Sequence, residues 1–315
     1  MDLKIGTWNL QNFGRPGDKV GAKTDAHYKT KLTALTATIS GLNPDVLGVQ
    51  ELGSQGALED LAKALGGTWH VHVAPRDERG IGVGVLSRLA LTHVGNISSF
   101  PPELSAVQSG DDGSTIATLA RPPIQVRLHA DGRDIDLICC HFKSKLLTFP
   151  GGRFSTTDED ERARFAAYAL YRRTTEAVTV RSKVTEMLAA AGDRAVVVLG
   201  DLNDEPEAAT TQILLGPPGS EIGTQGFSQP DQADAQRLWN LAPYIAEPER
   251  YSRLYRGHKE LIDHILVSHS LVGLVKDGDV TAGGGQPIRS IADDPKIDPG
   301  PSGSDHRPVV ASFSL

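Results

Sequence analysis

Cysteine, aromatic residues and long apolar runs are all scarce in this chain of 315 residues. The only 2 cysteines, Cys139 and Cys140, are adjacent, so they cannot close a loop through an ordinary disulfide, and we expect both to lie buried in a strand. No stretch approaches the ~20 apolar residues of a membrane helix, and no signal peptide is evident. These absences predict a soluble protein without a membrane span, cytoplasmic unless an export signal preceded Met1.

The chain also has no excess of positive charge. Its 32 Lys and Arg are outnumbered by 39 Asp and Glu, which gives a net charge of −7 and a pI near 5.8. A broadly basic surface that holds nucleic acid is therefore excluded. A polyanionic substrate would instead need local cations, such as a bound metal ion and a few arginines. No group of cysteines and histidines has the spacing of a structural zinc site.

Short apolar runs with strand character are present from one end of the chain to the other, and several alternate with helical segments. The strands are expected at residues 3–8, 46–50, 69–73, 82–86, 135–140, 195–199, 261–267 and 308–313. Helices are expected at residues 27–41, 54–65 and 158–191. No linker separates two cores, so the sequence predicts one α/β domain over residues 1–315.

Loops rich in Gly, Pro and Asp separate these elements. They cover residues 98–114, 145–157, 216–232 and 276–304. Loops longer than ~12–15 residues are usually functional or mobile. The last loop leads directly into Ser304-Asp305-His306, so we expect it to form a wall of a functional site.

Polar residues follow the predicted strands at the points where the strands end. The groups are Trp8-Asn9, Val49-Gln50-Glu51, Cys140-His141, Gly200-Asp201-Leu202-Asn203, Ile262-Asp263 and, before the last strand, Ser304-Asp305-His306. Ligands of layered α/β proteins bind at strand ends, so these groups are expected to converge on one edge. Each group alone is compatible with a simple turn. Their joint occurrence is not required by turn chemistry and indicates a site.

The residue types in these groups suit phosphoryl chemistry. Hard cations such as Mg²⁺ prefer oxygen ligands, which Glu51, Asp305 and Asn9 supply. Histidine exchanges protons near neutral pH, and His141 and His306 are the histidines placed beside such carboxylates.

The motifs together resemble the endonuclease/exonuclease/phosphatase superfamily, which includes pancreatic-type deoxyribonuclease, abasic-site endonucleases, neutral sphingomyelinases and inositol polyphosphate 5-phosphatases. The motifs span nearly the whole chain: Thr7-Trp8-Asn9, Asp45-Val46-Leu47-Gly48-Val49-Gln50-Glu51, Gly82-Val83-Gly84-Val85-Leu86-Ser87-Arg88, His141-Phe142-Lys143-Ser144-Lys145, Gly200-Asp201-Leu202-Asn203, Ile262-Asp263-His264-Ile265-Leu266 and Ser304-Asp305-His306-Arg307-Pro308. The resemblance implies two mixed β-sheets packed as a sandwich between helices, in four layers, with the site at one edge.

The resemblance also implies a metal site and a residue that activates water. Glu51 would be the principal ligand of Mg²⁺, or of Mn²⁺ or Ca²⁺, helped by Asn9 and Asp305. Asp201 would position or deprotonate the attacking water. Asn203 would donate a hydrogen bond to a phosphate oxygen as charge develops there.

Two histidines complete the implied machinery. His306 would bind the scissile phosphate or act as a base, with Asp263 accepting its other ring proton. His141 would contact the phosphate or protonate the leaving oxygen. An acidic residue orients this second histidine in the pancreatic-type nuclease, and Glu78 is the candidate for that role here.

The substrate is less constrained than the chemistry. Inositol 5-phosphatases and abasic-site endonucleases carry other patterns around Asp263, which disfavours both. The run from His141 to Lys145 is most similar to bacterial nucleases of the superfamily. Lys143, Lys145 and Arg153 lie on or near the loop after this histidine, where they would contact a phosphate backbone.

The leading prediction is therefore a divalent-metal-dependent phosphodiesterase, a nuclease with nucleic acid as substrate and no obligate protein partner. A phosphatase or a sphingomyelinase-like lipid phosphodiesterase is an alternative within the superfamily. An inactive binding scaffold is a second alternative, and it would have lost a metal ligand or a histidine, whereas Glu51, His141, Asp201 and His306 are all present.

Overall fold

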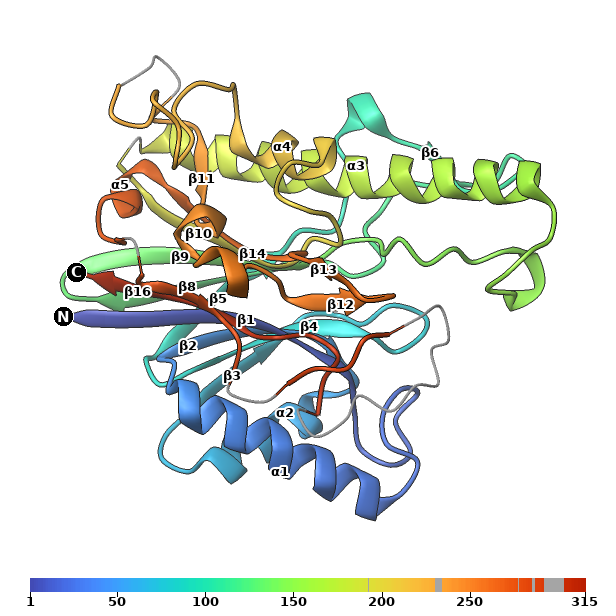
Figure 1. The fold of residues 1–315 in the computed structure, drawn as a ribbon, viewed down its shortest axis with the longest axis horizontal. Coiled ribbons are helices and arrows are strands. Elements are labelled where there is room, and N and C mark those ends of the chain that lie inside the picture. Colours follow the sequence, from blue (N-terminus) through green and yellow to red (C-terminus); the bar gives the residue numbers. More distant parts are fainter. Residues whose placement is uncertain (192, 230–233, 277, 285–286, 292–302) are drawn as a thin grey trace.

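The computed structural model describes residues 1–191, 193–229, 234–276, 278–284, 287–291 and 303–315. Two mixed six-stranded sheets pack face to face, and helices cover both outer faces (Figure 1). This confirms the predicted four-layer α/β sandwich. Residues 277, 285–286 and 292–302 of the long loop expected at residues 276–304 lie outside the described residues.

The first sheet contains the two ends of the chain. Its strand order is β15 (Val280–Ala282), β16 (Val309–Ser314), β1 (Asp2–Phe13), β2 (Val46–Leu52), β4 (Gly82–Ser87) and β3 (His70–Val73). Strands β1 and β2 are parallel, and β16 runs antiparallel to β1. The carboxyl ends of β1 and β2 therefore lie at the same edge as the start of β16.

The second sheet has an equivalent arrangement. Its strand order is β11 (Leu238–Asn240), β14 (Asp263–Ser268), β10 (Ala195–Asp201), β9 (Arg133–His141), β8 (Ile124–Ala130) and β5 (Leu91–Asn96). Strands β9 and β10 are parallel, and β14 runs antiparallel to β10. The ends of β9 and β10 therefore meet the start of β14.

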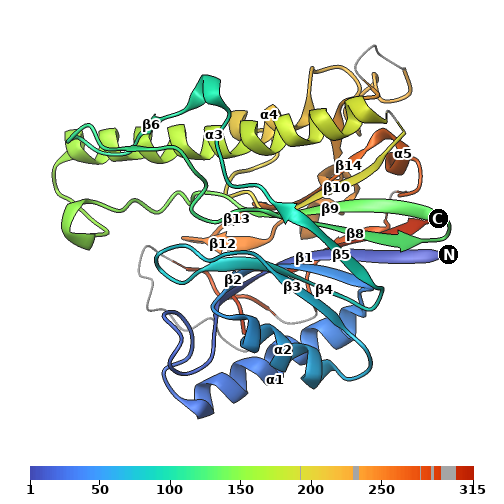
Figure 2. The ribbon, with the colours of Figure 1, turned by 180° about the vertical axis from the view of Figure 1, so that it is seen from behind.

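The outer layers are helical (Figures 1 and 2). Helices α1 (Asp25–Leu42) and α2 (Gln55–Leu65) cover the first sheet, and α3 (Glu159–Ala190) and α4 (Ala209–Leu215) cover the second. Side chains of Thr24, Ser54 and Asp158 accept hydrogen bonds from the first turns of α1, α2 and α3, which satisfies amides that a helix start leaves free. Within the described residues, no helix is both long and apolar enough to span a membrane.

The remaining elements are short. They are β6 (Val107–Gln108), β7 (Thr115–Ile116), β12 (Arg253–Tyr255), β13 (His258–Glu260), α5 (His269–Val272) and the 3-10 turns Pro102–Leu104, Pro150–Gly152, Ala242–Tyr244 and Glu247–Glu249. Strands β12 and β13 form a hairpin beside the edge where β14 begins.

The main apolar core lies between the sheets. It includes Ile5 and Val85 from the first sheet and Leu137 and Val197 from the second, all at most 1% exposed. A shared core of this kind is expected of a single folding unit, so we propose that the chain forms one domain. Cys139 is buried on this inner face, and both cysteines are free thiols with no solvent exposure, as predicted.

All eight predicted strands and all three predicted helices are present, with bounds that differ by at most a few residues. Of the strands in the two six-stranded sheets, the sequence did not reveal β5, β8, β11 and β15. Strand β5 is an edge strand whose residues Thr92, His93 and Val94 are exposed, so it has no apolar run. Strand β8 is interrupted by Arg127 and His129, which leaves only a short apolar segment.

Candidate active site

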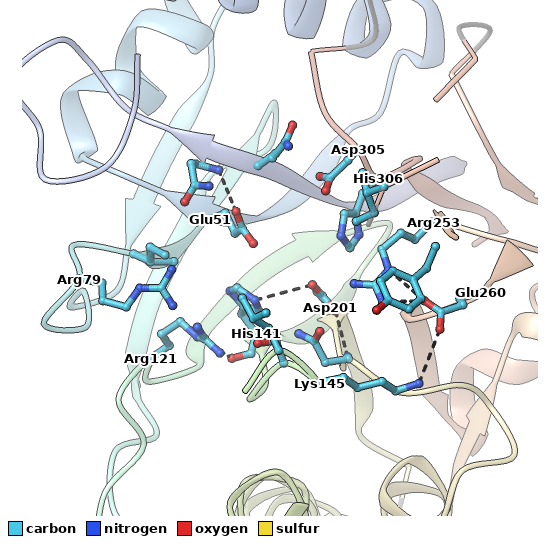
Figure 3. A pocket seen from close by; sticks show the side chains of 18 residues that line it. Glu51, Arg79, Arg121, His141, Lys145, Asp201, Arg253, Glu260, Asp305 and His306 are labelled. Atoms are coloured by element: carbon cyan, nitrogen blue, oxygen red, sulfur yellow. Dashed lines mark hydrogen bonds and ion pairs between the residues drawn. The ribbon is translucent and has the colours of Figure 1, made fainter. Parts of the chain in front are cut away.

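The predicted site residues meet at one edge of the sandwich because of the strand register (Figure 3). Asp201 at the end of β10 is paired with His141 on one side and with Asp263 on the other. The segment before β16 is held against β1, because the indole Nε1 of Trp8 donates to the carbonyl of His306 at 2.9 Å. The result is a cavity of about 240 Å³ between the ends of the two sheets.

Most of the predicted catalytic and metal-binding residues line this cavity. They are Glu51, His141, Asp201, Asn203, Asp305 and His306. Three of these come from the second sheet and its loops, and the others come from β2 and the segment that leads into β16. A single pocket thus collects residues from the whole length of the chain, as the sequence analysis expected.

The backbone at this edge adopts a left-handed conformation at several residues that are not glycine. The φ angles are 47° at Gln11, 53° at Asn12, 55° at Glu51 and 57° at Asn203. Such residues cost of order 1 kcal/mol or more each and often mark functional sites. Here they turn the chain sharply, and the amide of Asn12 donates to Glu51 Oε2 at 2.9 Å.

Asn9 is fully buried behind the cavity and orients two carboxylates. Its Nδ2 donates to Asp201 Oδ2 at 2.9 Å and to Glu51 Oε1 at 3.3 Å. The amide of Gln11 donates to the Asn9 Oδ1 at 2.9 Å, which fixes this orientation of the side chain. The structure therefore turns the amide nitrogen, and not the oxygen expected of a metal ligand, toward Glu51.

His306 is held as a buried imidazolium. Its Nδ1 lies 2.7 Å from Asp263 Oδ2, and Asp263 has no solvent exposure. Burial alone disfavours the charged ring, but the charge and the hydrogen bond of Asp263 outweigh it and raise the pKa of His306 to about 10. The ring is therefore protonated at neutral pH, with Nε2 left for a ligand.

His141 has the opposite character. Burial, together with the positive charge of Arg121, holds the pKa of His141 well below its usual value, so the ring is neutral. Its Nε2 lies 3.7 Å from Asp201 Oδ2, whereas its buried Nδ1 has no hydrogen-bond partner among the described residues. Glu78 is exposed and makes no such bond, so it does not orient this ring in the structure.

The third proton-carrying group is Asp201, which lies between the two histidines (Figure 3). Burial and the nearby charge of Asp263 raise the pKa of Asp201 to about 7. Its Oδ1 accepts the amide of Asn203 at 2.9 Å. A carboxyl group that titrates near neutral pH is suited to general base catalysis.

Several cationic residues at the cavity were missed by the sequence analysis. Arg121 is buried and donates to the carbonyl oxygens of His141 at 3.1 Å and Phe142 at 2.7 Å, and it lies 3.8 Å from Asp77. Asp77, in the loop between β3 and β4, thus acts on the end of β9 through Arg121. The sequence had instead predicted a direct contact between Glu78 and His141. No motif marks Arg121, which lies 20 residues before His141.

Two more arginines, Arg79 and Arg253, line the cavity. Arg253 pairs with Glu260 at 2.6 Å, and Glu260 also lies 3.9 Å from Lys145. Arg79 is exposed and makes no ion pair with any described residue. Arg79 is therefore a cation that a substrate phosphate could engage without breaking an existing pair.

The three predicted substrate contacts differ in position. Lys145 lines the cavity and is 39% exposed, although it pairs with Asp204 at 3.3 Å. The ammonium of Lys143 is turned back onto its own loop and donates to the carbonyl of Leu146 at 2.6 Å. Arg153 lies outside the cavity lining and pairs with Glu161 at 2.7 Å. Only Lys145 is thus placed to meet a ligand.

The sequence matches the family model described as "Endonuclease/Exonuclease/phosphatase family" over residues 6–306. The chain belongs to this family. No curated protein sequence gives a significant match.

Solved structures show the same fold at low sequence identity. A family protein from Bacteroides thetaiotaomicron has a TM-score of 0.58 and 17% identity over 100% of this chain and 99% of that chain. Truncated TDP2 from Caenorhabditis elegans has a TM-score of 0.56 and 14% identity, with 100% and 98% covered. A mannosyl-6-phosphatase from Bacteroides thetaiotaomicron has a TM-score of 0.56 and 15% identity, with 99% and 100% covered.

Members of this family generally use divalent metals, and the cavity has a suitable donor set. Glu51 and Asp305 are half-buried, line the cavity and make no ion pair with a described residue. Lys31 of α1 lies near both carboxylates, and its ammonium donates to the Gln11 carbonyl at 2.5 Å. Burial lowers the pKa of Lys31 to about 8, although the negative charges of Asp305 and Glu51 act in the opposite direction. Unpaired carboxylates in a pocket fit a hard cation such as Mg²⁺.

A second group of potential ligands lies next to this pair. One ligand atom from each of Asp201, Asp263 and His306 lies within 4.8 Å of the others. The Nδ1 of His306 is already engaged by Asp263, and Asp201 accepts bonds from Asn9 and Asn203. We therefore favour Glu51 and Asp305 as the metal ligands, with the other group acting on protons and phosphate.

Proposed function

We propose that the protein is a divalent-metal-dependent phosphodiesterase that hydrolyses nucleic acid. The observation that carries this proposal is the convergence on one cavity of a charged histidine, a neutral histidine, a carboxyl group with a pKa of about 7 and two carboxylates that make no ion pair with a described residue. Hydrolysis of a phosphate ester uses these functions together: a base for water, positive charge for the phosphate and a hydrogen-bond donor for the leaving oxygen.

Glu51 and Asp305 would hold the metal, with Asn9 fixing the direction of Glu51. A bound divalent cation would neutralise phosphate charge and polarise the phosphoryl group. Glu51 is prepared for this role because the amide of Asn12 and the Nδ2 of Asn9 each donate to one of its oxygens. The free lone pairs of both oxygens remain available to a cation in the cavity.

Asp201 would accept a proton from the attacking water, since its pKa of about 7 leaves a basic carboxylate at neutral pH. The protonated His306 would donate through Nε2 to a phosphate oxygen, while Asp263 keeps the ring oriented. Asn203 donates one amide hydrogen to the carbonyl of Phe142 at 3.0 Å, so its second hydrogen can stabilise developing charge on the phosphate. His141, held neutral, would donate a hydrogen bond to the leaving oxygen, which would take up its proton from solvent water.

The nucleic-acid assignment rests on the cations at the cavity mouth. Arg79 and Lys145 are the exposed cationic side chains of the lining. They would contact phosphates on either side of the scissile bond, because they lie on opposite sides of His141 (Figure 3). The net charge of −7 implies that binding depends on these few residues and on the metal.

A phosphomonoesterase is the second candidate. The specific observation in its favour is the ion-paired wall that Lys145, Glu260 and Arg253 form along one side of the cavity. A sugar phosphatase also shares this fold at a TM-score of 0.56. A monoester would need room for only one substituent on the phosphate.

Hydrolysis assays separate these candidates. Bis-p-nitrophenyl phosphate, p-nitrophenyl phosphate, single- and double-stranded DNA, RNA and sphingomyelin would each be offered with EDTA, Mg²⁺ or Mn²⁺, beside His306→Ala. Metal-dependent cleavage of the diester and of nucleic acid, lost in the variant, is the expected result. Cleavage of the monoester alone would establish a phosphatase, and hydrolysis of sphingomyelin alone would establish a lipid phosphodiesterase. Retained activity in the variant would contradict the assigned site.

A further inference from the structure

Helix α3 carries buried charged residues on the side that faces the site. Arg173 is 6% exposed and Glu176 is 2% exposed, although a helix that covers a sheet normally buries apolar side chains. The next turns follow that rule, because Ala177, Val180 and Val184 pack onto the outer face of the second sheet. A buried charge is costly unless it is paired and hydrogen-bonded, so this pair requires a structural reason.

Both residues bind the backbone of Lys143. The amide of Lys143 donates to Glu176 Oε2 at 2.6 Å, and the carbonyl of Lys143 accepts from the Arg173 Nη1 at 3.0 Å. Helix α3 thus satisfies both polar backbone groups of a residue that comes two positions after His141. Arg172 supports the arrangement by donating to Glu176 Oε1 at 2.9 Å.

The same arginine also binds the loop that follows β10. The Nε of Arg173 donates to Asp204 Oδ2 at 3.1 Å, and this oxygen also accepts from the Thr210 hydroxyl at 2.7 Å. The carbonyl of Asp204 lies 2.8 Å from His264 Nε2, which holds this loop from β14. Asp204 directly follows Asn203, so one guanidinium connects the segments that leave β9 and β10.

These segments are the ones that set the relative positions of the reacting groups. The amide of Phe142 donates to the carbonyl of Asp201 at 3.0 Å. The Nδ2 of Asn203 donates to the carbonyl of Phe142 at 3.0 Å. A shift of Lys143 or Asp204 would therefore move His141 relative to Asp201, and catalytic groups lose about 10²-fold in rate when misplaced by about 1 Å.

We propose that Arg173 and Glu176 are positioning residues that fix the distance between His141 and the Asp201 to Asn203 turn. They act through the backbone of Lys143 and through Asp204, and neither residue lines the cavity. The proposal rests on the proposed function for its kinetic consequence. Its geometric content concerns the position of His141 and does not depend on the reaction.

The test uses a matched control on the same helix. Arg181 also donates to backbone carbonyls, those of Leu214 at 3.0 Å and Gln236 at 2.8 Å, and it lies outside the cavity lining. Arg173→Met removes one bond to a backbone carbonyl and the ion pair with Asp204, and Arg181→Met removes two bonds to backbone carbonyls, but only the first change acts on the catalytic loops. Glu176→Gln keeps an oxygen that accepts the Lys143 amide, whereas Glu176→Ala does not.

The measurements are melting temperature, kcat and KM on bis-p-nitrophenyl phosphate, and the NMR signal of the His141 ring, assigned with His141→Gln. Arg173→Met should lower kcat by about 10- to 100-fold with little change in KM, and should shift the His141 signal. Arg181→Met should lower the melting temperature with neither of these effects. Glu176→Gln should retain more activity than Glu176→Ala.

Two results would overturn the proposal: an unmoved His141 signal in Arg173→Met, or an equal loss of kcat in Arg181→Met. A wild-type protein that hydrolyses no phosphate ester would contradict the proposed function. The His141 signal would then still decide whether Arg173 positions this ring, so the two failures are distinguishable.

Discussion

Replacing Asp263 with Asn should remove the charge of His306 at alkaline pH. Against the effect of burial, the carboxylate of Asp263, with smaller contributions from Asp201 and Asp305, raises the pKa of His306 from 6.5 to about 10. The difference of about 3.5 units corresponds to roughly 5 kcal/mol in favour of the protonated ring, at about 1.4 kcal/mol per unit. In Asp263→Asn, burial is no longer offset by this partner, and the pKa should fall to its ordinary value or below.

The kinetic effect follows from the population of the charged ring. At pH 8 a pKa of about 10 leaves about 99% of His306 protonated, whereas an ordinary value leaves about 3%. The rate should therefore fall at least about 30-fold at this pH. Loss of ring orientation adds to this, and removal of such an orienting carboxylate costs up to about 10⁴-fold in a serine protease triad.

The assay is the pH dependence of diester hydrolysis for wild type, Asp263→Asn and Asp136→Asn. Asp136 is a matched control because it is also a buried carboxylate, 1% exposed, but it pairs with Arg127 and Arg194 at the other end of β9. Wild type and the control should remain active until pH approaches 10, whereas Asp263→Asn should lose activity near neutral pH. The same alkaline limit in all three proteins would refute the reasoning.

The free energy of unfolding should depend on pH through the same ionisation of His306. A histidine whose pKa is raised by folding contributes stability that is complete below its unfolded pKa of about 6.5 and is lost as the pH rises through its folded pKa. The pair of His306 and Asp263 should thus stabilise the wild type most at pH 6 and progressively less up to about pH 10. Melting temperatures of Asp263→Asn should lack this slope.

Three further predictions concern the metal, the base and the phosphate contacts. Glu51→Gln should weaken Mg²⁺ binding by about 10-fold or more in calorimetry without unfolding the protein, and unchanged affinity would exclude Glu51 as a ligand. Asp201→Asn should lower kcat by about 10²- to 10⁴-fold. The wild-type rate should fall as the pH drops below the Asp201 pKa of about 7, and a cation bound nearby should move this fall to lower pH. Lys145→Ala should raise KM for DNA, whereas Arg153→Ala, outside the cavity lining, should leave KM unchanged; equal effects would place the substrate elsewhere.

The sequence predicted the fold and the location of the site because both depend on strands and their ends. The strand that ends at Asp201 is mostly apolar and buried along its whole length, and the parallel strand that ends at His141 is buried from Ile135 onward. Parallel register then places the two ends side by side. Helix starts were predictable for a similar local reason, as Ser54 and Asp158 are N-caps.

The direction of long side chains was not predictable from sequence. Lys143 and Lys145 alternate along one short segment, yet only Lys145 reaches the cavity, because the ammonium of Lys143 is held by carbonyl oxygens of its own loop. The choice of Glu78 failed for a related reason. Asp77 and Glu78 are adjacent acids, and their contacts depend on Arg121, which only the tertiary structure brings to the β9 end.

The buried network on α3 was also hidden. The helix has charged residues on several faces, and the sequence pattern indicates a solvated surface for most of them. Arg162 fits this pattern, because it pairs with Glu159 on the exposed side of the helix. Arg173 and Glu176 differ only in facing the loops after β9 and β10, which depends on how the helix is rotated on the sheet.

The most direct test of the central claim is cleavage of DNA by protein stripped of metal with EDTA, followed by titration with Mg²⁺ for wild type and Glu51→Gln. The account predicts no cleavage in EDTA, saturable recovery with Mg²⁺ in the wild type, and recovery only at higher Mg²⁺ in the variant. Cleavage that persists without metal, or identical titrations of the two proteins, would contradict it.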